Sequence, residues 1–210
     1  RFTVQACFSP EDPESEVSKA ADVVSYNHYF GWYAGETEDN AVWLDDFREH
    51  FPRRALGLSE YGCEGIVGRH ALFPRRGDYS LEYQAEYHEK MAKIISERSW
   101  LWATHVWNMF DFASAARDEG GVKGMNNKGL VSYDRKVKKD PFYLYKAYWS
   151  NIPFVHIAGG EKQARAGEKC VVKVYSNLPE VTLYVGKNAF ETKKGDKVFT
   201  FEVPLKRVVK

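Results

Sequence analysis

Hydrophobic positions in the first 150 residues alternate between continuous apolar runs and runs with helical spacing. Runs rich in β-branched and aromatic residues predict strands, and apolar residues recurring every three or four positions predict helices. The predicted strands span residues 2–8, 22–26, 56–59 and 100–107, and two predicted helices span 39–51 and 81–98. Asp140-Pro141 predicts the N-cap and first-turn proline of a third helix that ends at Trp149. This repeated strand–helix order predicts a parallel α/β fold.

Each of the first two predicted helices has an apolar stripe that should face the sheet. The stripes are Val42, Leu44, Phe47 and Phe51 in the first helix, and Leu81, Ala85, His88, Ala92 and Ile95 in the second. His88 belongs to such a stripe and His105 lies within a predicted strand, so both are predicted to be satisfied core residues. Ser80 is the predicted N-cap of the second helix.

The pattern changes after residue 152. Short alternating runs separated by Gly, Pro, Asn and Lys predict strands at 154–158, 170–176, 181–185 and 198–203. This pattern is typical of an antiparallel, immunoglobulin-like β-sandwich, which usually has about seven strands, so the module is predicted to be partial. We therefore expect two domains, spanning residues 1–152 and 153–210.

Composition narrows the possible functions. Thirty basic and 29 acidic residues give a net charge of +1, which argues against nucleic acid or an anionic membrane as partner. No apolar run approaches the roughly 18 residues of a membrane span. The odd number and wide spacing of Cys7, Cys63 and Cys170 predict free thiols, which favours the cytoplasm, and predict no metal site. The chain begins and ends in strand-like runs, which predicts a piece of something longer.

The candidate chemistry lies at the ends of the predicted strands, where barrel enzymes hold their active sites. Glu60 ends one strand, Trp107 ends another, and an aromatic loop with Asn27, Tyr29 and Tyr33 follows a third. A carboxylate beside a tyrosine hydroxyl and indole rings suits an oxocarbenium-like centre. A glutamate at a strand end is, however, more often a helix cap or half of an ion pair. The sequence contains no competing serine elbow or phosphate loop.

Four runs together resemble glycoside hydrolase family 2, the β-galactosidase and β-glucuronidase family. They are Tyr26-Asn-His-Tyr-Phe-Gly-Trp-Tyr33, Ser59-Glu-Tyr-Gly62, the run from Trp102 to Phe112, and Asn126-Asn-Lys-Gly-Leu-Val-Ser-Tyr-Asp-Arg-Lys136. The resemblance covers residues 1 to about 150 and implies the fifth to eighth strands of an eight-stranded TIM barrel, with the remainder starting the following β-sandwich. The family's acid/base glutamate, which ends the fourth barrel strand, has no counterpart here.

The resemblance also implies roles for single residues. Glu60 matches the family's nucleophile and Tyr29 the tyrosine that hydrogen-bonds it. Tyr33 matches an aromatic beside the sugar, and Trp107 matches the floor of the sugar pocket. Asn126 and Lys128 match the Asn-x-Lys pair that holds the sugar carboxylate in β-glucuronidases, although galactosidases with a similar long loop share the surrounding sequence.

We therefore expect part of a retaining exo-β-glycosidase, with β-galactosidase as the leading interpretation and β-glucuronidase as the alternative. A third interpretation is a carbohydrate-binding or scaffold module without catalysis. The expected partners are a small carbohydrate substrate, the missing N-terminal half of the parent protein and, in a homo-oligomer, further copies. No cofactor is evident. Without the upstream glutamate, the chain alone is expected to be inactive.

Overall fold

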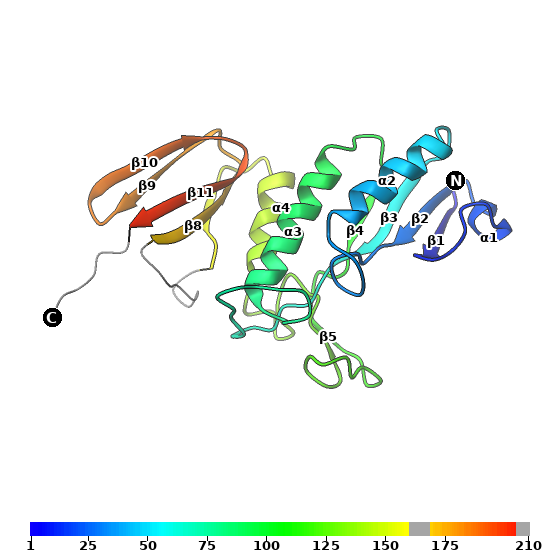
Figure 1. Cartoon of the computed structure of the whole chain (residues 1–210), viewed down its shortest axis with the longest axis horizontal. Coiled ribbons are helices and arrows are strands. Elements are labelled where there is room, and N and C mark those ends of the chain that lie inside the picture. The colour runs from blue at the N-terminus through cyan, green and yellow to red at the C-terminus, as the bar shows by residue number, and fades with distance from the viewer. Residues whose placement is uncertain (160–168, 205–210) are drawn as a thin grey trace.

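The computed structural model describes residues 1–159 and 169–204. Its N-terminal part is built on a four-stranded parallel sheet in the order β1-β2-β3-β4 (Figure 1). The strands are β1 (Val4–Phe8), β2 (Val23–Asn27), β3 (Leu56–Tyr61) and β4 (Thr104–Val106). The predicted parallel α/β arrangement is confirmed, although β4 is much shorter than the predicted strand at 100–107.

Helices follow the strands, as the sequence predicts. They are α1 (Glu16–Lys19), α2 (Asp39–His50), α3 (Leu81–Ser96) and α4 (Asp140–Trp149). The Ser80 hydroxyl accepts the backbone N–H of Tyr83 and caps α3, as predicted. The prediction for Asp140 was wrong: Lys139 occupies the N-cap position, and α4 begins at Asp140. The Asp140 carboxylate instead bonds His156 and the backbone N–H of Gly159.

One main core joins the sheet to its helices. Among its fully buried side chains are Tyr26, Leu56 and Leu58 from the sheet and Leu44, Met91 and Leu144 from the helices. Two burial predictions were wrong. Val42 is 60% exposed because α2 turns it away from the sheet, while Leu44 and Phe47 are buried. His105 is exposed because it lies on edge strand β4, although its ring Nδ1 lies 3.1 Å from the Leu58 carbonyl and so has the predicted polar partner.

The C-terminal part is antiparallel. A three-stranded sheet in the order β11-β8-β7 contains Lys197–Pro204, Lys169–Ser176 and Val155–Ile157, and β9 (Glu180–Val185) pairs with β10 (Asn188–Lys194). A small apolar cluster of Val174, Val181, Phe199 and Phe201 joins β8, β9 and β11. Strand β10 was not predicted, because its side chains are mostly exposed and polar and have no apolar alternation.

The two parts contact each other through α3, α4 and β8 (Figure 1). Glu89 on α3 accepts hydrogen bonds from Lys173, at 2.6 Å, and from the Tyr175 hydroxyl, at 2.5 Å. His156 Nε2 lies 2.9 Å from Asp140 at the start of α4. These bonds fix the C-terminal sheet against the helices.

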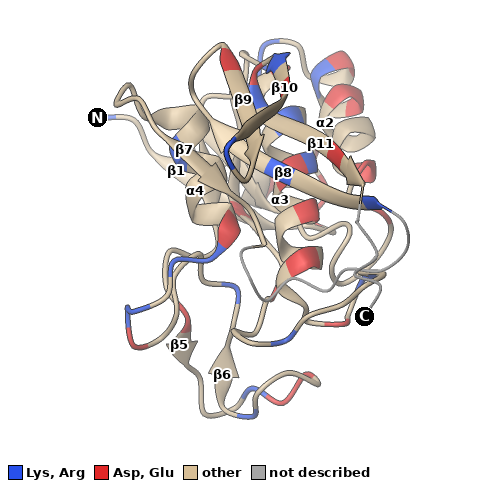
Figure 2. Cartoon of the chain, turned by 90° about the vertical axis from the view of Figure 1, so that its left-hand side faces the viewer, with Lys and Arg blue, Asp and Glu red and all other residues tan. Residues whose placement is uncertain are grey.

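The long connection between β4 and α4 carries a two-stranded antiparallel pair, β5 (Phe112–Ala113) and β6 (Met125–Asn126). It extends away from the helices and bears charges of both signs (Figure 2). A buried ion pair fixes its base: Lys139 Nζ lies 2.8 Å from the Asp111 carboxylate. Burial raises the pKa of Asp111 and lowers that of Lys139, so the pair depends on their mutual attraction.

Candidate active site

Glu60 and Tyr29 form the centre of the candidate site. Glu60 is near the end of β3, and Tyr29 lies two residues beyond the neighbouring strand β2. The Tyr29 hydroxyl donates to Glu60 Oε2 at 2.7 Å. Burial, followed by the bond to Glu60, raises the pKa of Tyr29 above its usual value. Tyr29 therefore remains a protonated donor, and its hydroxyl fixes the orientation of the carboxylate.

The sheet register brings Asn27 to the same place. Asn27 pairs with Glu60 across β2 and β3, and its side-chain oxygen accepts a 2.7 Å hydrogen bond from the Ser59 hydroxyl. Because Ser59 immediately precedes Glu60, this bond ties the ends of the two strands together. The predicted juxtaposition of Asn27, Tyr29 and Glu60 is therefore present in the structure.

Trp107 follows β4, the next strand along the sheet. Its backbone N–H donates to the Tyr61 carbonyl at 2.8 Å. The Trp107 carbonyl lies against Gly62, where a Cβ would come within 2.2 Å of the Trp107 oxygen. Glycine at position 62 therefore lets the two strand ends approach closely. The indole packs edge-on against Phe112. Because β3 and β4 are parallel and Tyr61 lies opposite Val106, residue 107 is at the same end of the sheet as Glu60.

Lys128 supplies a buried positive charge beside these residues. Its side chain is 1% exposed, and Nζ lies 2.8 Å from the Tyr33 hydroxyl and 5.4 Å from the centre of the Tyr29 ring. The Tyr29 side chain thus has Glu60 at its hydroxyl and Lys128 over its ring. An ammonium held over aromatic rings is stabilised by their quadrupoles.

The backbone around Lys128 is tightly held. The Asn126 side-chain oxygen accepts the Lys128 N–H at 3.0 Å, and Asp111 accepts the Gly129 N–H at 2.9 Å. A Cβ at Gly129 would lie 2.0 Å from the Asp111 backbone nitrogen, so a larger residue would displace the loop. Asn126 is buried and orders the turn that presents Lys128, while its predicted contact with a sugar stays a prediction.

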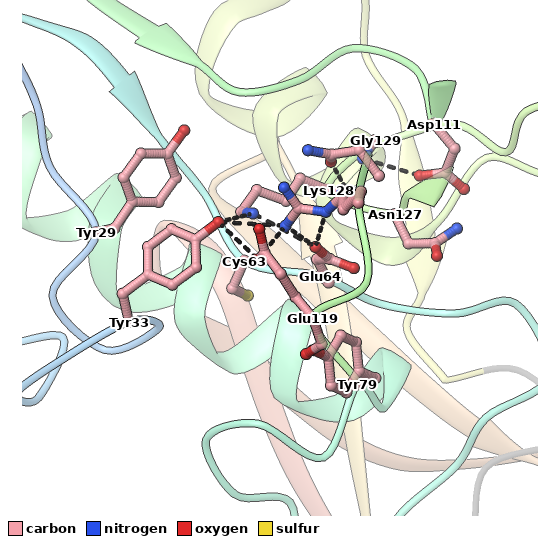
Figure 3. Close-up of polar contacts among 12 residues, drawn as sticks. Tyr29, Tyr33, Cys63, Glu64, Tyr79, Asp111, Glu119, Asn127, Lys128 and Gly129 are labelled. Atoms are coloured by element: carbon pink, nitrogen blue, oxygen red, sulfur yellow. Dashed lines mark hydrogen bonds and ion pairs between the residues drawn. The ribbon is translucent and has the colours of Figure 1, made fainter. Parts of the chain in front are cut away.

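A second group of charges surrounds Lys128 (Figure 3). Buried Glu64 lies 3.4 Å from Lys128 Nζ and also accepts from Arg117, whose Nε is 3.1 Å away. Arg117 Nη2 donates to Glu119 at 2.8 Å and to the Tyr33 hydroxyl at 3.2 Å. The Tyr33 hydroxyl in turn donates to Glu119 at 3.1 Å. We call Glu64, Arg117, Glu119 and Lys128 the charge cluster.

Of this charge cluster, the sequence predicted a site role only for Lys128. Glu64 and Arg117 are 53 positions apart and come from two irregular connections. The only available signal was the unusual length and charge of the connection carrying Arg117 and Glu119, since long loops in compact domains are often functional.

Two hollows of about 590 Å³ each flank Tyr33. One is mainly apolar and is lined by Phe8, Ser9, Pro10, Asn27, Tyr29, Phe30, Tyr33 and Ala34. The other is lined by Trp32, Tyr33, Arg69, Gly77, Tyr79, Glu119 and Gly120. Tyr33 is 55% exposed and separates them, so its ring is available to a ligand on either side. Aromatic walls with a few polar groups are usual in small-molecule sites.

Within residues 1–159 and 169–204, no three His, Cys, Asp or Glu side chains gather in a way that could hold a metal ion. The helices in the same ranges include none with the length and apolarity of a membrane span.

Comparisons with known proteins identify the relatives. No protein-family model matches the chain. A β-glucuronidase of Bacteroides fragilis is 33% identical over 198 residues, which are 91% of this chain and 28% of that protein. The crystal structure of an FMN-binding β-glucuronidase from Faecalibacterium prausnitzii L2-6 is 54% identical, with a TM-score of 0.94 over 98% of this chain.

A putative β-galactosidase from Bacteroides fragilis is also similar, at 27% identity and a TM-score of 0.79 over 97% of this chain. The chain spans only 32% of the F. prausnitzii protein and 35% of this one. Similarity over nearly the whole chain, to β-glucuronidases above all, agrees with the four sequence runs noted above. The chain belongs to glycoside hydrolase family 2, the family of β-glucuronidases and β-galactosidases.

Proposed function

We propose that the full-length protein containing this chain is a retaining exo-β-glycosidase whose nucleophile is Glu60. The observation that supports this most is the 2.7 Å hydrogen bond from Tyr29 to Glu60 at the carboxyl end of a parallel sheet. In this proposal the four strands are half of an eight-stranded barrel. Residues 1–152 then belong to the catalytic domain, and residues 153–210 begin a β-sandwich.

The proposed reaction has two steps. Glu60 attacks the anomeric carbon to form a glycosyl-enzyme, while a second carboxyl group about 5 Å away protonates the leaving oxygen. Water then releases the sugar, and the same second group takes the water's proton. Tyr29 holds Glu60 in one orientation and, because its own proton is retained, donates to the carboxylate both before attack and after release. We assign the second carboxyl group to a part of the protein outside this chain.

We propose β-glucuronides as the substrates. Lys128 is a buried cation beside Tyr29, and a buried charge is costly unless it is paired. A sugar carboxylate would add a charge-assisted partner in this place, with the ammonium and the Tyr33 hydroxyl as donors. The names of the similar proteins point the same way, whereas our leading interpretation from sequence was a β-galactosidase.

β-Galactosides are the second candidate, for a specific reason. Glu64 already lies 3.4 Å from Lys128, so the cation has a partner without any sugar carboxylate. With its charge neutralised in this way, Lys128 could donate to a neutral hydroxyl. The putative β-galactosidase among the similar structures is consistent with this alternative.

The initial rates at which the full-length protein hydrolyses nitrophenyl β-glucuronide and nitrophenyl β-galactoside distinguish the two candidate substrates. Lys128→Ala should lower kcat/KM for the glucuronide by about tenfold to a hundredfold, the value of a charge-assisted bond. Lys123→Ala is the matched control, since Lys123 is 80% exposed on the same connection. A faster reaction with the galactoside, unaffected by Lys128→Ala, would instead assign the protein to the β-galactosidases.

We propose that this reaction requires no redox cofactor. Displacement and hydrolysis at an anomeric carbon transfer no electrons, so two carboxyl groups are enough. FMN binding describes the F. prausnitzii relative, and the proposed chemistry of Glu60 has no step for a flavin. The partner that the site requires is a small carbohydrate.

A further inference from the structure

One carboxylate of the charge cluster, that of Glu119, lies where the carboxylate of a ligand could replace it. Glu119 Oε2 accepts from Arg117 Nη2 at 2.8 Å and from the Tyr33 hydroxyl at 3.1 Å. That same hydroxyl accepts from Lys128 Nζ at 2.8 Å. A carboxylate at this point therefore has one guanidinium and one hydroxyl as direct donors, and that hydroxyl is itself bonded by an ammonium. Figure 3 shows the side chains of Glu119, Tyr33 and Lys128 in this arrangement.

Charge balance shows what a second carboxylate would require. Arg117 and Lys128 carry two positive charges, and Glu64 and Glu119 carry two negative charges, so the cluster is neutral as it stands. An acidic sugar that enters while both glutamates remain would leave the cluster with one excess negative charge. Like charges at short range in a partly buried site are unfavourable, so displacement of one carboxylate would favour the binding of an acidic sugar.

Only one of the two acids can leave easily. The Glu64 side chain is 2% exposed and bonds both cations, whereas the Glu119 side chain is 43% exposed. The Tyr79 hydroxyl donates to the backbone carbonyl of Glu119 and holds the main chain in place. Rotation of the Glu119 side chain into water therefore breaks two partly exposed bonds and moves no backbone.

We propose that Glu119 is a specificity-determining residue, a built-in competitor that accepts the hydrogen bond of the Tyr33 hydroxyl until a sugar carboxylate, held by that hydroxyl and by Lys128, displaces it. This inference rests on the proposed function and deepens it, because it concerns the affinity of the same site for acidic sugars. The displaced contact is a partly exposed ion pair, which contributes little to stability. Removing the Glu119 charge should therefore strengthen the binding of an acidic sugar only about threefold to fivefold.

The test compares Glu119→Gln with Asp118→Asn in the full-length protein. Asp118 is the adjacent acid, is 64% exposed and pairs only with Lys123 among the ion pairs of the described residues, so its substitution changes the net charge equally. Both variants should fold, because Arg117 keeps its bonds to Glu64. The probes are D-glucuronate and D-glucose, which differ at one carboxylate, titrated by tryptophan fluorescence.

We expect the ratio of the glucuronate to the glucose dissociation constant to fall about threefold to fivefold in Glu119→Gln and to stay unchanged in Asp118→Asn. An unchanged ratio in Glu119→Gln, a weaker glucuronate affinity, or no glucuronate binding in any variant would overturn the inference. The proposed function is judged separately, by whether the unmodified protein hydrolyses nitrophenyl β-glucuronide. If the protein binds glucuronate as expected but hydrolyses only galactosides, the role of Glu119 stands and the proposed substrate is wrong.

Discussion

Two glutamates four positions apart have opposite surroundings. Glu60 receives one hydrogen bond from a neutral phenol, while buried Glu64 is paired with the cations of Arg117 and Lys128. A carboxylate held by two cations gives up its electron pairs less readily than one held by a hydroxyl. The neighbours of each acid, more than its place in the sequence, therefore support the proposal that Glu60 is the nucleophile, while Glu64 balances the charge of the two cations.

Glu60→Gln should remove nearly all turnover of the full-length protein, because an amide cannot form the glycosyl-enzyme of a retaining reaction. The fold should persist, since the Tyr29 hydroxyl can still donate to the amide oxygen. A 2-fluoro glycoside with a good leaving group should label the unmodified protein at Glu60, as peptide mass spectrometry would detect. A label on Glu64 or Glu119 would refute the assignment of the nucleophile.

Tyr29→Phe should lower kcat/KM about tenfold to a hundredfold, the value of one hydrogen bond to a charged group. The ring that packs against Tyr33 and lies under Lys128 is retained, so substrate binding through Lys128 should change little. Tyr184→Phe provides the control, because Tyr184 is 61% exposed on β9. Equal rates for the Tyr29 and Tyr184 variants would remove Tyr29 from the proposed mechanism.

The sequence predicts part of this site for a clear physical reason. Asn27, Tyr29 and Glu60 lie at or just beyond the ends of neighbouring parallel strands, so a correct strand order brings them together. The charge cluster instead depends on where two irregular connections cross. Glu64 and Arg117 have no periodic pattern that relates them, and only the folded loop shows that they meet.

At the scale of elements, the order of strands and helices was predictable because the apolar side chains of each run pack into one shared core. The errors occur where local rules meet tertiary contacts. Asp140-Pro141 fits an N-cap motif, but the Asp140 carboxylate bonds His156 on β7 and the backbone N–H of Gly159 just beyond it. Edge strand β4 leaves His105 exposed, although its apolar neighbours indicated burial. Contacts with residues distant in the sequence therefore determine the hydrogen bonds and the burial of side chains that local sequence motifs do not specify.

Helix α3 carries a buried histidine that should make the fold acid-sensitive. Burial lowers the pKa of His88 from 6.5 to about 3, so the folded state holds its ring neutral. The unfolded chain binds the proton below pH about 6.5, and the stabilisation is therefore complete above that pH and is lost as pH falls toward 3. The loss is at most about 1.4 kcal/mol per pH unit for one group.

Thermal unfolding of the full-length protein at pH 7.5 and 5.5 tests this expectation. The free energy of unfolding should fall between pH 7.5 and 5.5, and His88→Asn should make this fall smaller by about 1.4 kcal/mol. The reason is that pH 5.5 lies one unit below 6.5, the pKa of the histidine in the unfolded chain. His50→Asn, at an exposed position on α2, should leave the fall unchanged. An identical fall in the unmodified and His88→Asn proteins would show that this histidine is not the acid-sensitive group.

At the scale of the whole molecule, the parallel sheet of the described residues has two unpaired edges. β1 and β4 each pair on one side only, and Val4 and Phe8 on β1 are 53% and 70% exposed. Exposed strand edges with apolar side chains favour association with further strands. This geometry supports the proposal that the rest of a barrel covers these strands in the full-length protein.

Residues 1–210 produced alone should therefore self-associate and should release no nitrophenol from any nitrophenyl glycoside. Attack on the anomeric carbon and protonation of the leaving oxygen require two carboxyl groups. In the proposed mechanism Glu60 has the first role, while Glu64 and Glu119 are paired with Arg117. Light scattering would report the size of the particles, and the same assay on the full-length protein is the positive control. Hydrolysis by a purified monomer of these residues that Glu60→Gln abolishes would mean that an acid within the chain protonates the leaving group, and the proposed half-barrel would have to be abandoned.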